Sequence, residues 1–232
     1  MTKGDVLWGL ILAAVLASFA DPYTAKVLLS LTASHPYAMG FAKFALLATM
    51  GELLVVRLSR GAWRSPGGLW ARALVWGLVG ILVVLMFALF SAGVAAIAAK
   101  GLLPVGDGLL KSLLIAFWTS ALMNLTFGPA FMAAHRVSDA WIASRFGAPG
   151  TKEENPSGKA MEPPSKVRLA ESVASVDWNH FLGFVVGKTI PLFWIPAHTI
   201  TFLLPGEYRV LVAALLSIAL GVILTWGKKT KA

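Results

Sequence analysis

Three charged side chains lie well inside long apolar stretches of this 232-residue chain, away from the ends of those stretches: Lys43, Glu52 and Lys188. A charge at membrane depth is costly unless a partner or water compensates it, so such residues commonly serve function. If the apolar stretches cross a membrane, Glu52 and Lys188 lie in the same half of it and could pair, although Arg57 or Arg60 could pair with Glu52 instead. Lys43 lies in the other half and could extend to the headgroups. The arrangement predicts either structural ion pairs or the lining of a water-filled path.

Two polar side chains within other apolar stretches, Asn124 and His198, add hydrogen-bonding groups at membrane depth. Such groups usually connect neighbouring helices, and a ligand-binding or proton-relay role is the alternative. Candidate lining residues of a solute pathway are therefore Lys43, Glu52, Asn124, Lys188 and His198.

Motifs for other chemistry are missing from the sequence. The four histidines lack metal-ligand spacing, and the chain has no cysteine. No nucleophile elbow, phosphate-binding loop or paired-acid motif is present. We therefore expect no metal, no cofactor and no enzyme. Basic residues at the ends of apolar stretches are candidates for contacts with lipid headgroups; they are Arg57, Arg60, Arg64, His135 and Arg136. As an alternative, His135 and Arg136 could form an exposed helix end together with Asp139.

The elements that must position these residues are six apolar stretches. Hydrophobic residues make up 57% of the chain and charged residues 13%, and the mean hydropathy is +0.75, which excludes a soluble domain. Most stretches approach the ~20 residues that a membrane-spanning helix needs. We predict an all-α polytopic membrane protein with about six membrane helices, of which the first could be short or interfacial. The stretches are Val6–Ala20, Pro36–Leu58, Ala71–Ala99, Leu109–Ala134, Phe181–Leu204 and Val210–Trp226.

The net charge of +9 comes mainly from Lys and Arg in alternate gaps between the stretches. Cytoplasmic loops are enriched in these residues, so both termini are predicted to be cytoplasmic, which agrees with an even number of spans. No basic stripe with interleaved aromatic residues suggests nucleic acid as a partner. Membrane lipids are the expected partners.

Composition divides the chain into three parts. Residues 1–146 form a four-helix membrane part, and residues 179–232 form a two-helix hairpin of the same membrane domain. Residues 147–178 form a cytoplasmic linker, rich in Pro and Gly, that ends in a short surface helix. Small residues at membrane depth, such as Gly80 and the Gly183–Gly187 pair, favour close helix packing within the chain, with a homo-oligomer as the alternative. Pro129 and Pro191 should bend their helices.

Several motifs resemble the Mpv-seventeen and peroxisomal membrane protein family. His35-Pro36-Tyr37 followed by Gly51-Glu52 resembles the start of that family's first core helix. Trp194, Pro196, Phe202, the Pro205–Arg209 segment and Trp226 resemble its C-terminal signature, in which His198 and Thr201 replace a Gln and an Asn. The resemblance implies a channel-like membrane protein. With the Ala-rich, basic composition, it suggests a bacterial relative in the cytoplasmic (inner) membrane.

Three functions follow as hypotheses. The first is a channel-like pathway for small solutes or ions, which would favour anions if Lys43 and Lys188 face water. The second is a non-transporting scaffold whose basic cytoplasmic loops bind partners or anionic lipid. The third is an intramembrane lipid-modifying enzyme, which would need His135, Asp139 or Glu52 in a cleft open to the headgroups.

Overall fold

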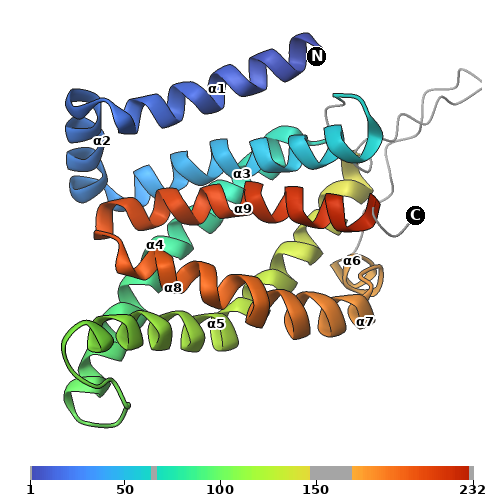
Figure 1. Ribbon diagram of the computed structural model, residues 1–232. Helices are drawn as coiled ribbons and strands as arrows, with labels where there is room; N and C mark the ends of the chain where they lie inside the picture. Colours follow the sequence, from blue (N-terminus) through green and yellow to red (C-terminus); the bar gives the residue numbers. More distant parts are fainter. Residues whose placement is uncertain (1, 64–66, 147–168, 230–232) are drawn as a thin grey trace, which may run out of the picture.

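The computed structural model of the chain describes residues 2–63, 67–146 and 169–229, and all regular structure within these ranges is helical (Figure 1). Six of the described segments are long and apolar enough to cross a membrane. The chain is therefore an all-α integral membrane protein, as predicted. Most of the predicted linker (147–168) and Arg64 lie outside the described residues.

Ten helical segments are present in the described part of the chain. In chain order they are α1 (Lys3–Ala20), α2 (Pro22–Ser34), α3 (Pro36–Arg60), α4 (Leu69–Ala99), α5 (Gly108–Phe146), α6 (Leu169–Ala174), α7 (Trp178–His180), the π-helix η1 (Phe181–Trp194), α8 (Ile195–Leu203) and α9 (Gly206–Lys229). The segments α7, η1 and α8 together form the fifth span, Trp178–Leu203. The short α6 lies where a surface helix was predicted.

Helix α2 was not predicted, because its 13 residues are too few to cross a bilayer. Asp21 ends α1 and caps α2: its carboxylate accepts hydrogen bonds from the Thr24 backbone N–H (2.9 Å) and hydroxyl (3.0 Å). These bonds lower the pKa of Asp21 from its ordinary value. Pro22 occupies the first turn, where its missing N–H is tolerated. The chain therefore turns sharply between α1 and α3 (Figure 1).

The spans form one bundle around α3. This helix packs against α4 and α9, and α5 packs against α4 and α8. The first turn of α1 and the last turns of α9 lie at the same end of the bundle (Figure 1). That end, where α3 ends, α4 begins and α5 ends, carries Arg57, Arg60, Arg72 and Arg136, and is called the basic end below.

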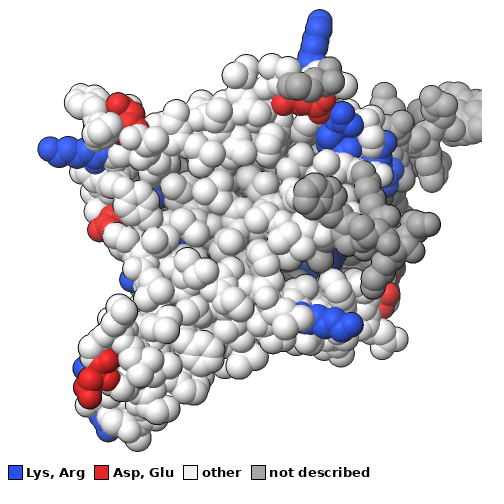
Figure 2. Space-filling model, viewed as in Figure 1, with Lys and Arg blue, Asp and Glu red and all other residues white. Residues whose placement is uncertain are grey.

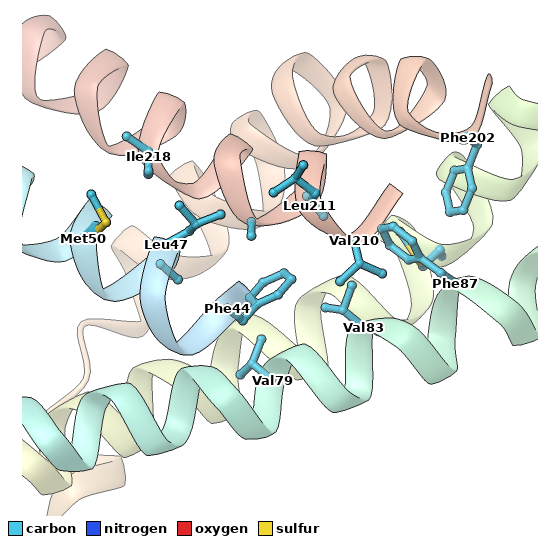
Figure 3. Packing of buried hydrophobic residues seen from close by; sticks show 14 of the residues in the cluster. Phe44, Leu47, Met50, Val79, Val83, Phe87, Phe202, Val210, Leu211 and Ile218 are labelled. Carbon is cyan, nitrogen blue, oxygen red and sulfur yellow. The ribbon is translucent and has the colours of Figure 1, made fainter. Parts of the chain in front are cut away.

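The core lies where α3, α4, α8 and α9 meet. Phe44, Val83, Phe87, Phe202 and Val210 are among its buried residues (Figure 3). Lipid tails are as apolar as these side chains, so burial alone does not hold the helices together. The quality of packing and the polar contacts between helices must do so.

Close packing is visible where α3 crosses α4. A side chain at Gly80 would meet the carbonyl oxygen of Gly40, and one at Gly77 would meet the ring of Phe41. Packing within the chain is thus confirmed for these glycines. The prediction of close packing within the chain is wrong for Gly183, which has open space beside it because η1 turns this face away from the rest of the bundle.

The prolines act in two ways. Pro129 lies inside α5, and this helix changes direction along its length (Figure 1). Pro191 lies inside η1, a 14-residue π-helix whose hydrogen bonds reach back five residues, as the bond from Ile195 N–H to Ile190 O illustrates. The π-helix is rare in proteins, and single π-helical turns frequently occur at functional sites.

Candidate functional site

A cluster of charged residues joins three helices at the basic end. The buried guanidinium of Arg72, which is 4% exposed, lies with Nη1 3.1 Å from Asp139 Oδ1 and 3.6 Å from Glu52 Oε2. The indole N–H of Trp76 donates to Glu52 Oε1 over 2.9 Å. Both carboxylates are therefore held by one fixed cation, and Glu52 has a second donor.

Helix geometry brings these residues to one depth. Arg72 is in the first turn of α4, and Trp76 follows one turn later on the same face. Glu52 lies about two turns before the end of α3, which connects to α4 at this end. Asp139 lies two turns before the end of α5.

His135 completes the cluster from α5. Its Nε2 is 3.5 Å from Asp139 Oδ2, as expected for residues four apart on a helix. Its ring centroid is 4.2 Å from that of Trp76, and its buried Nδ1 has no hydrogen-bond partner among the described residues. The sequence prediction of an exposed helix end is wrong here, because α4 covers this face of α5 and leaves the side chains of His135 and Asp139 only 17% and 28% exposed.

The cluster also has the ligand atoms of a metal site. One oxygen or nitrogen each from Glu52, His135 and Asp139 lie within 4.8 Å of one another. However, the guanidinium of Arg72 already bridges the two carboxylates and supplies the positive charge that a metal would bring. The donor set thus fits a metal poorly in this conformation.

A cavity of about 580 Å³ extends from the cluster into the bundle. Arg60 and Arg136, both exposed, line its mouth beside the cluster. Deeper in, the lining is almost wholly apolar, with side chains from α3, α4, α5, η1, α8 and α9. The apolar lining includes Phe44, Met86, Phe87, Met123, Phe127, Phe131, Met132 and Val185.

A small polar group lies at the deep end of this cavity. Asn124 Nδ2 is 2.8 Å from the Ser120 carbonyl oxygen and 3.2 Å from His198 Nδ1. The amide must donate to His198 Nδ1, so a neutral His198 carries its proton on Nε2. Trp194 also lines the cavity, and its buried indole N–H has no acceptor among the described residues. Hydrogen-bond donors are thus present at both ends of an apolar chamber.

A second pocket of about 270 Å³ lies toward the opposite end of the bundle. Arg209, Glu207 and Ser91 contribute its polar lining. The guanidinium of Arg209 donates to the backbone oxygens of Leu204 (2.9 Å) and Phe202 (3.0 Å). Arg209 therefore fixes the turn between α8 and α9 beside this pocket.

Phe87 lines both cavities. Its side chain is 6% exposed, and its ring packs 4.8 Å from the ring of Phe202 and 5.6 Å from that of His198, measured between centroids. Figure 3 shows Phe87 beside Phe202 and Val210, with Val83 one turn earlier on α4. This apolar layer separates the two cavities.

Three of the five predicted lining residues, Glu52, Asn124 and His198, line the larger cavity. Lys43 does not: its ammonium donates to the Thr32 hydroxyl over 2.8 Å and lies 5.7 Å from the centre of the Phe19 ring. It is buried between α2 and α3 instead of extending to the headgroups.

Lys188 is also outside both cavities, exposed on the surface of η1. The predicted alternative of a Glu52–Lys188 ion pair is therefore wrong. Glu52 points toward α4, where Arg72 and Trp76 bind it, whereas Lys188 points away from the bundle.

The predicted headgroup residues separate into two groups. Arg60, His135 and Arg136 line the mouth of the larger cavity. Arg57 instead pairs with Asp5 of α1 at 2.7 Å, and the indole N–H of Trp63 donates to the same carboxylate. Arg57 thus connects α1 to α3.

Known proteins do not decide what the site does. Scans against protein-family models, curated proteins and solved structures find no match for this chain.

Sequence reasoning missed Arg72, Trp76 and Trp194 as site residues, because Arg72 was counted as a loop charge and tryptophans are common near membrane interfaces. The signal that could have found Arg72 is its spacing of four residues from Trp76, which places both side chains on one face of the same helix.

Proposed function

We propose that the protein is a channel-like pathway for anions, closed in this conformation by the apolar layer at Phe87. The observation that carries the proposal is that Phe87 lines a cavity on each side of it. Two chambers that approach one another at a single buried ring would connect if that ring moved aside. Hydrophobic constrictions of this kind gate other pores by excluding water.

Fixed charges favour anions. Arg60, Arg72 and Arg136 line the larger cavity, where Glu52 and Asp139 supply the negative charges. Both carboxylates are bound by Arg72, so they attract cations weakly, while the cavity keeps a net positive charge. These arginines take the part that was predicted for Lys43 and Lys188.

We further propose that both termini are cytoplasmic and that the membrane is a bacterial cytoplasmic membrane. The basic end carries Arg57, Arg60, Arg72 and Arg136, and the cytoplasmic side of membrane proteins is enriched in Lys and Arg. The larger cavity then opens toward the cytoplasm. The resemblance to the Mpv-seventeen family supports a channel-like role.

Anion flux through reconstituted protein tests the proposal. In liposomes, Phe87→Ala should raise chloride and nitrate flux severalfold over the unsubstituted protein, with potassium flux remaining lower, because removing the ring connects the chambers. Leu89→Ala is the matched control, since Leu89 is on the same helix but 58% exposed on its outer surface. Phe87→Leu, which preserves apolar packing, should give an intermediate flux.

Flux no greater than in protein-free liposomes for all variants, each with an unchanged gel-filtration profile, would overturn the pathway. If the same protein instead bound anionic vesicles through Arg60 and Arg136, the scaffold hypothesis would replace it. A cation preference in Phe87→Ala would overturn the anion assignment alone.

A second candidate is an enzyme that acts on lipid, because Glu52, His135 and Asp139 meet at a cavity mouth near headgroup depth. A histidine beside a carboxylate can act as a general base. Turnover of phospholipid in proteoliposomes that is lost in both His135→Gln and Asp139→Asn would support this candidate. Turnover that is absent, or unchanged in both variants, would dismiss it.

A further inference from the structure

The larger cavity separates its charged and apolar parts along its length. Its charged lining residues, Glu52, Arg60, Arg72, Arg136 and Asp139, lie at the basic end, whereas the chamber beyond them is lined by rings, methionines and aliphatic side chains. An inorganic anion gains from the first part but little from the apolar chamber, whose only strongly polar described lining groups are at its deep end. A ligand that satisfies both parts has a charged head and an apolar body.

The charges at the mouth specify the sign of that head. Arg72 is committed to the two carboxylates, at 3.1 Å from Asp139 and 3.6 Å from Glu52. Arg60 and Arg136 are exposed beside them and give the mouth a net positive charge. A carboxylate or phosphate can accept charge-assisted hydrogen bonds from guanidinium groups, whereas a cationic head would be repelled.

The cavity also extends between two helices. Val185 and Thr189 of η1 and Ser217 and Gly221 of α9 all contribute to its lining. In the described part of the chain, η1 packs against α5, α7 and α8, while α9 packs mainly against α3. The path of α7, η1 and α8 diverges from α9 between their shared turn and the basic end (Figure 1).

The surface around this divergence suits a ligand that arrives from the bilayer. Figure 2 shows that the charged side chains on this face gather toward the ends of the bundle, with an uncharged surface between them. An apolar chain in the bilayer thus meets an uncharged surface beside the two helices, η1 and α9, that line the cavity.

We propose that this cavity binds a single-chain anionic amphiphile, taken from the bilayer between η1 and α9. A volume of about 580 Å³ is typical of small-molecule sites and suits one chain with a compact head better than a two-chain lipid. The indole N–H of Trp194, which has no acceptor in the described part of the chain, lies at the deep end. The inference rests on the proposed function only in using the same cavity, for which it names the ligand class.

Photolabelling of the full chain in phosphatidylcholine nanodiscs tests the ligand. The probe is a long-chain fatty acid with a diazirine at the chain end, and labelled residues are located by mass spectrometry. Labels should fall on Met123, Phe127 or Trp194. Oleate and oleoyl lysophosphatidate should compete, whereas oleyl alcohol and oleylamine should compete about tenfold less, because only the first two bond the arginines.

Variants test the two parts of the cavity separately. The double substitution Arg60→Gln with Arg136→Gln should weaken labelling about tenfold, as loss of charged contacts predicts. The matched control, Lys100→Gln with Lys111→Gln, removes two exposed cations from the other end of the bundle and should leave labelling unchanged. Ser217→Trp should reduce labelling by filling the space beside α9.

The outcomes are decisive in each direction. Competition by oleate but not lysophosphatidate would restrict the head to a carboxylate, and competition by both would admit either source of negative charge. Labels confined to outward-facing residues such as Leu89, or equal competition by oleyl alcohol, would overturn the inference. Chloride flux in Phe87→Ala without specific labelling would overturn the inference but leave the proposed function standing. Specific labelling without chloride flux would overturn the proposed function but leave the inference standing.

Discussion

The crossing of α3 and α4 makes a sharp prediction for Gly80. A Cβ atom at this position would overlap the carbonyl oxygen of Gly40 and lie 2.7 Å from its carbonyl carbon. Both are backbone atoms, so no side-chain rotation can relieve the contact. Gly80→Ala must therefore push α3 and α4 apart, at the crossing where the two helices pack most closely.

The magnitude follows from two opposing terms. Alanine in a helix is about 0.5–1 kcal/mol more favourable than glycine. Overpacking typically costs about 1–3 kcal/mol, and this contact should lie near the upper limit because backbone must move. Gly93 is on the same helix and has open space beside it, so Gly93→Ala keeps the first term without the second. The difference in unfolding free energy between the two variants should be about 1–3 kcal/mol.

Equilibrium unfolding in mixed micelles, titrated with a denaturing detergent, measures this difference. We expect Gly80→Ala to be less stable than the unsubstituted chain and Gly93→Ala to be equal or more stable. If Gly80→Ala were as stable as Gly93→Ala, the close approach of α3 to α4 would be refuted.

Two further predictions concern charged residues. Arg72→Met leaves Glu52 and Asp139 facing each other without their cation, and should lower the free energy of unfolding by about 3–5 kcal/mol. The double variant Arg72→Met with Glu52→Gln should recover part of this loss in the same detergent titration. No recovery in the double variant would argue against the shared ion pair. Asp21 has a lowered folded pKa, so its capping contribution is present above the unfolded pKa of about 3.9 and is lost as pH falls through the folded value. The stability difference between the unsubstituted chain and Asp21→Asn, measured from pH 7 to pH 3, should therefore shrink at low pH, and a constant difference would contradict the assignment.

The depth of a residue in the membrane could be predicted from the sequence, but the direction in which its side chain points from the helix could not. Apolar length located the six spans, and the charge pattern placed Glu52 in the half nearest the basic end. The partner of Glu52 depends on how α3 is rotated against its neighbours, which a uniformly apolar helix does not reveal. Lys188 was therefore proposed as the partner where the structure has Arg72.

Residues at the ends of apolar stretches were the hardest to interpret. Arg72, His135 and Asp139 were assigned to loops or exposed helix ends, because the apolar stretches were taken to end near them. In the structure α4 and α5 continue as helices to Leu69 and Phe146, which brings these polar side chains together at the cavity mouth. When a helix extends beyond its apolar stretch, hydropathy alone assigns the polar residues at its end to a loop.

The position of Phe87 also sets the rate at which the two cavities could connect. An exposed ring changes rotamer within picoseconds to nanoseconds, but Phe87 is confined by Phe202 at the end of α8 and Val210 at the start of α9. Arg209 holds that turn to the backbone oxygens of Phe202 and Leu204. A passage past Phe87 must therefore wait for collective movement of α8 and α9, so openings should recur on a microsecond-to-millisecond timescale, far slower than the motion of the ring itself.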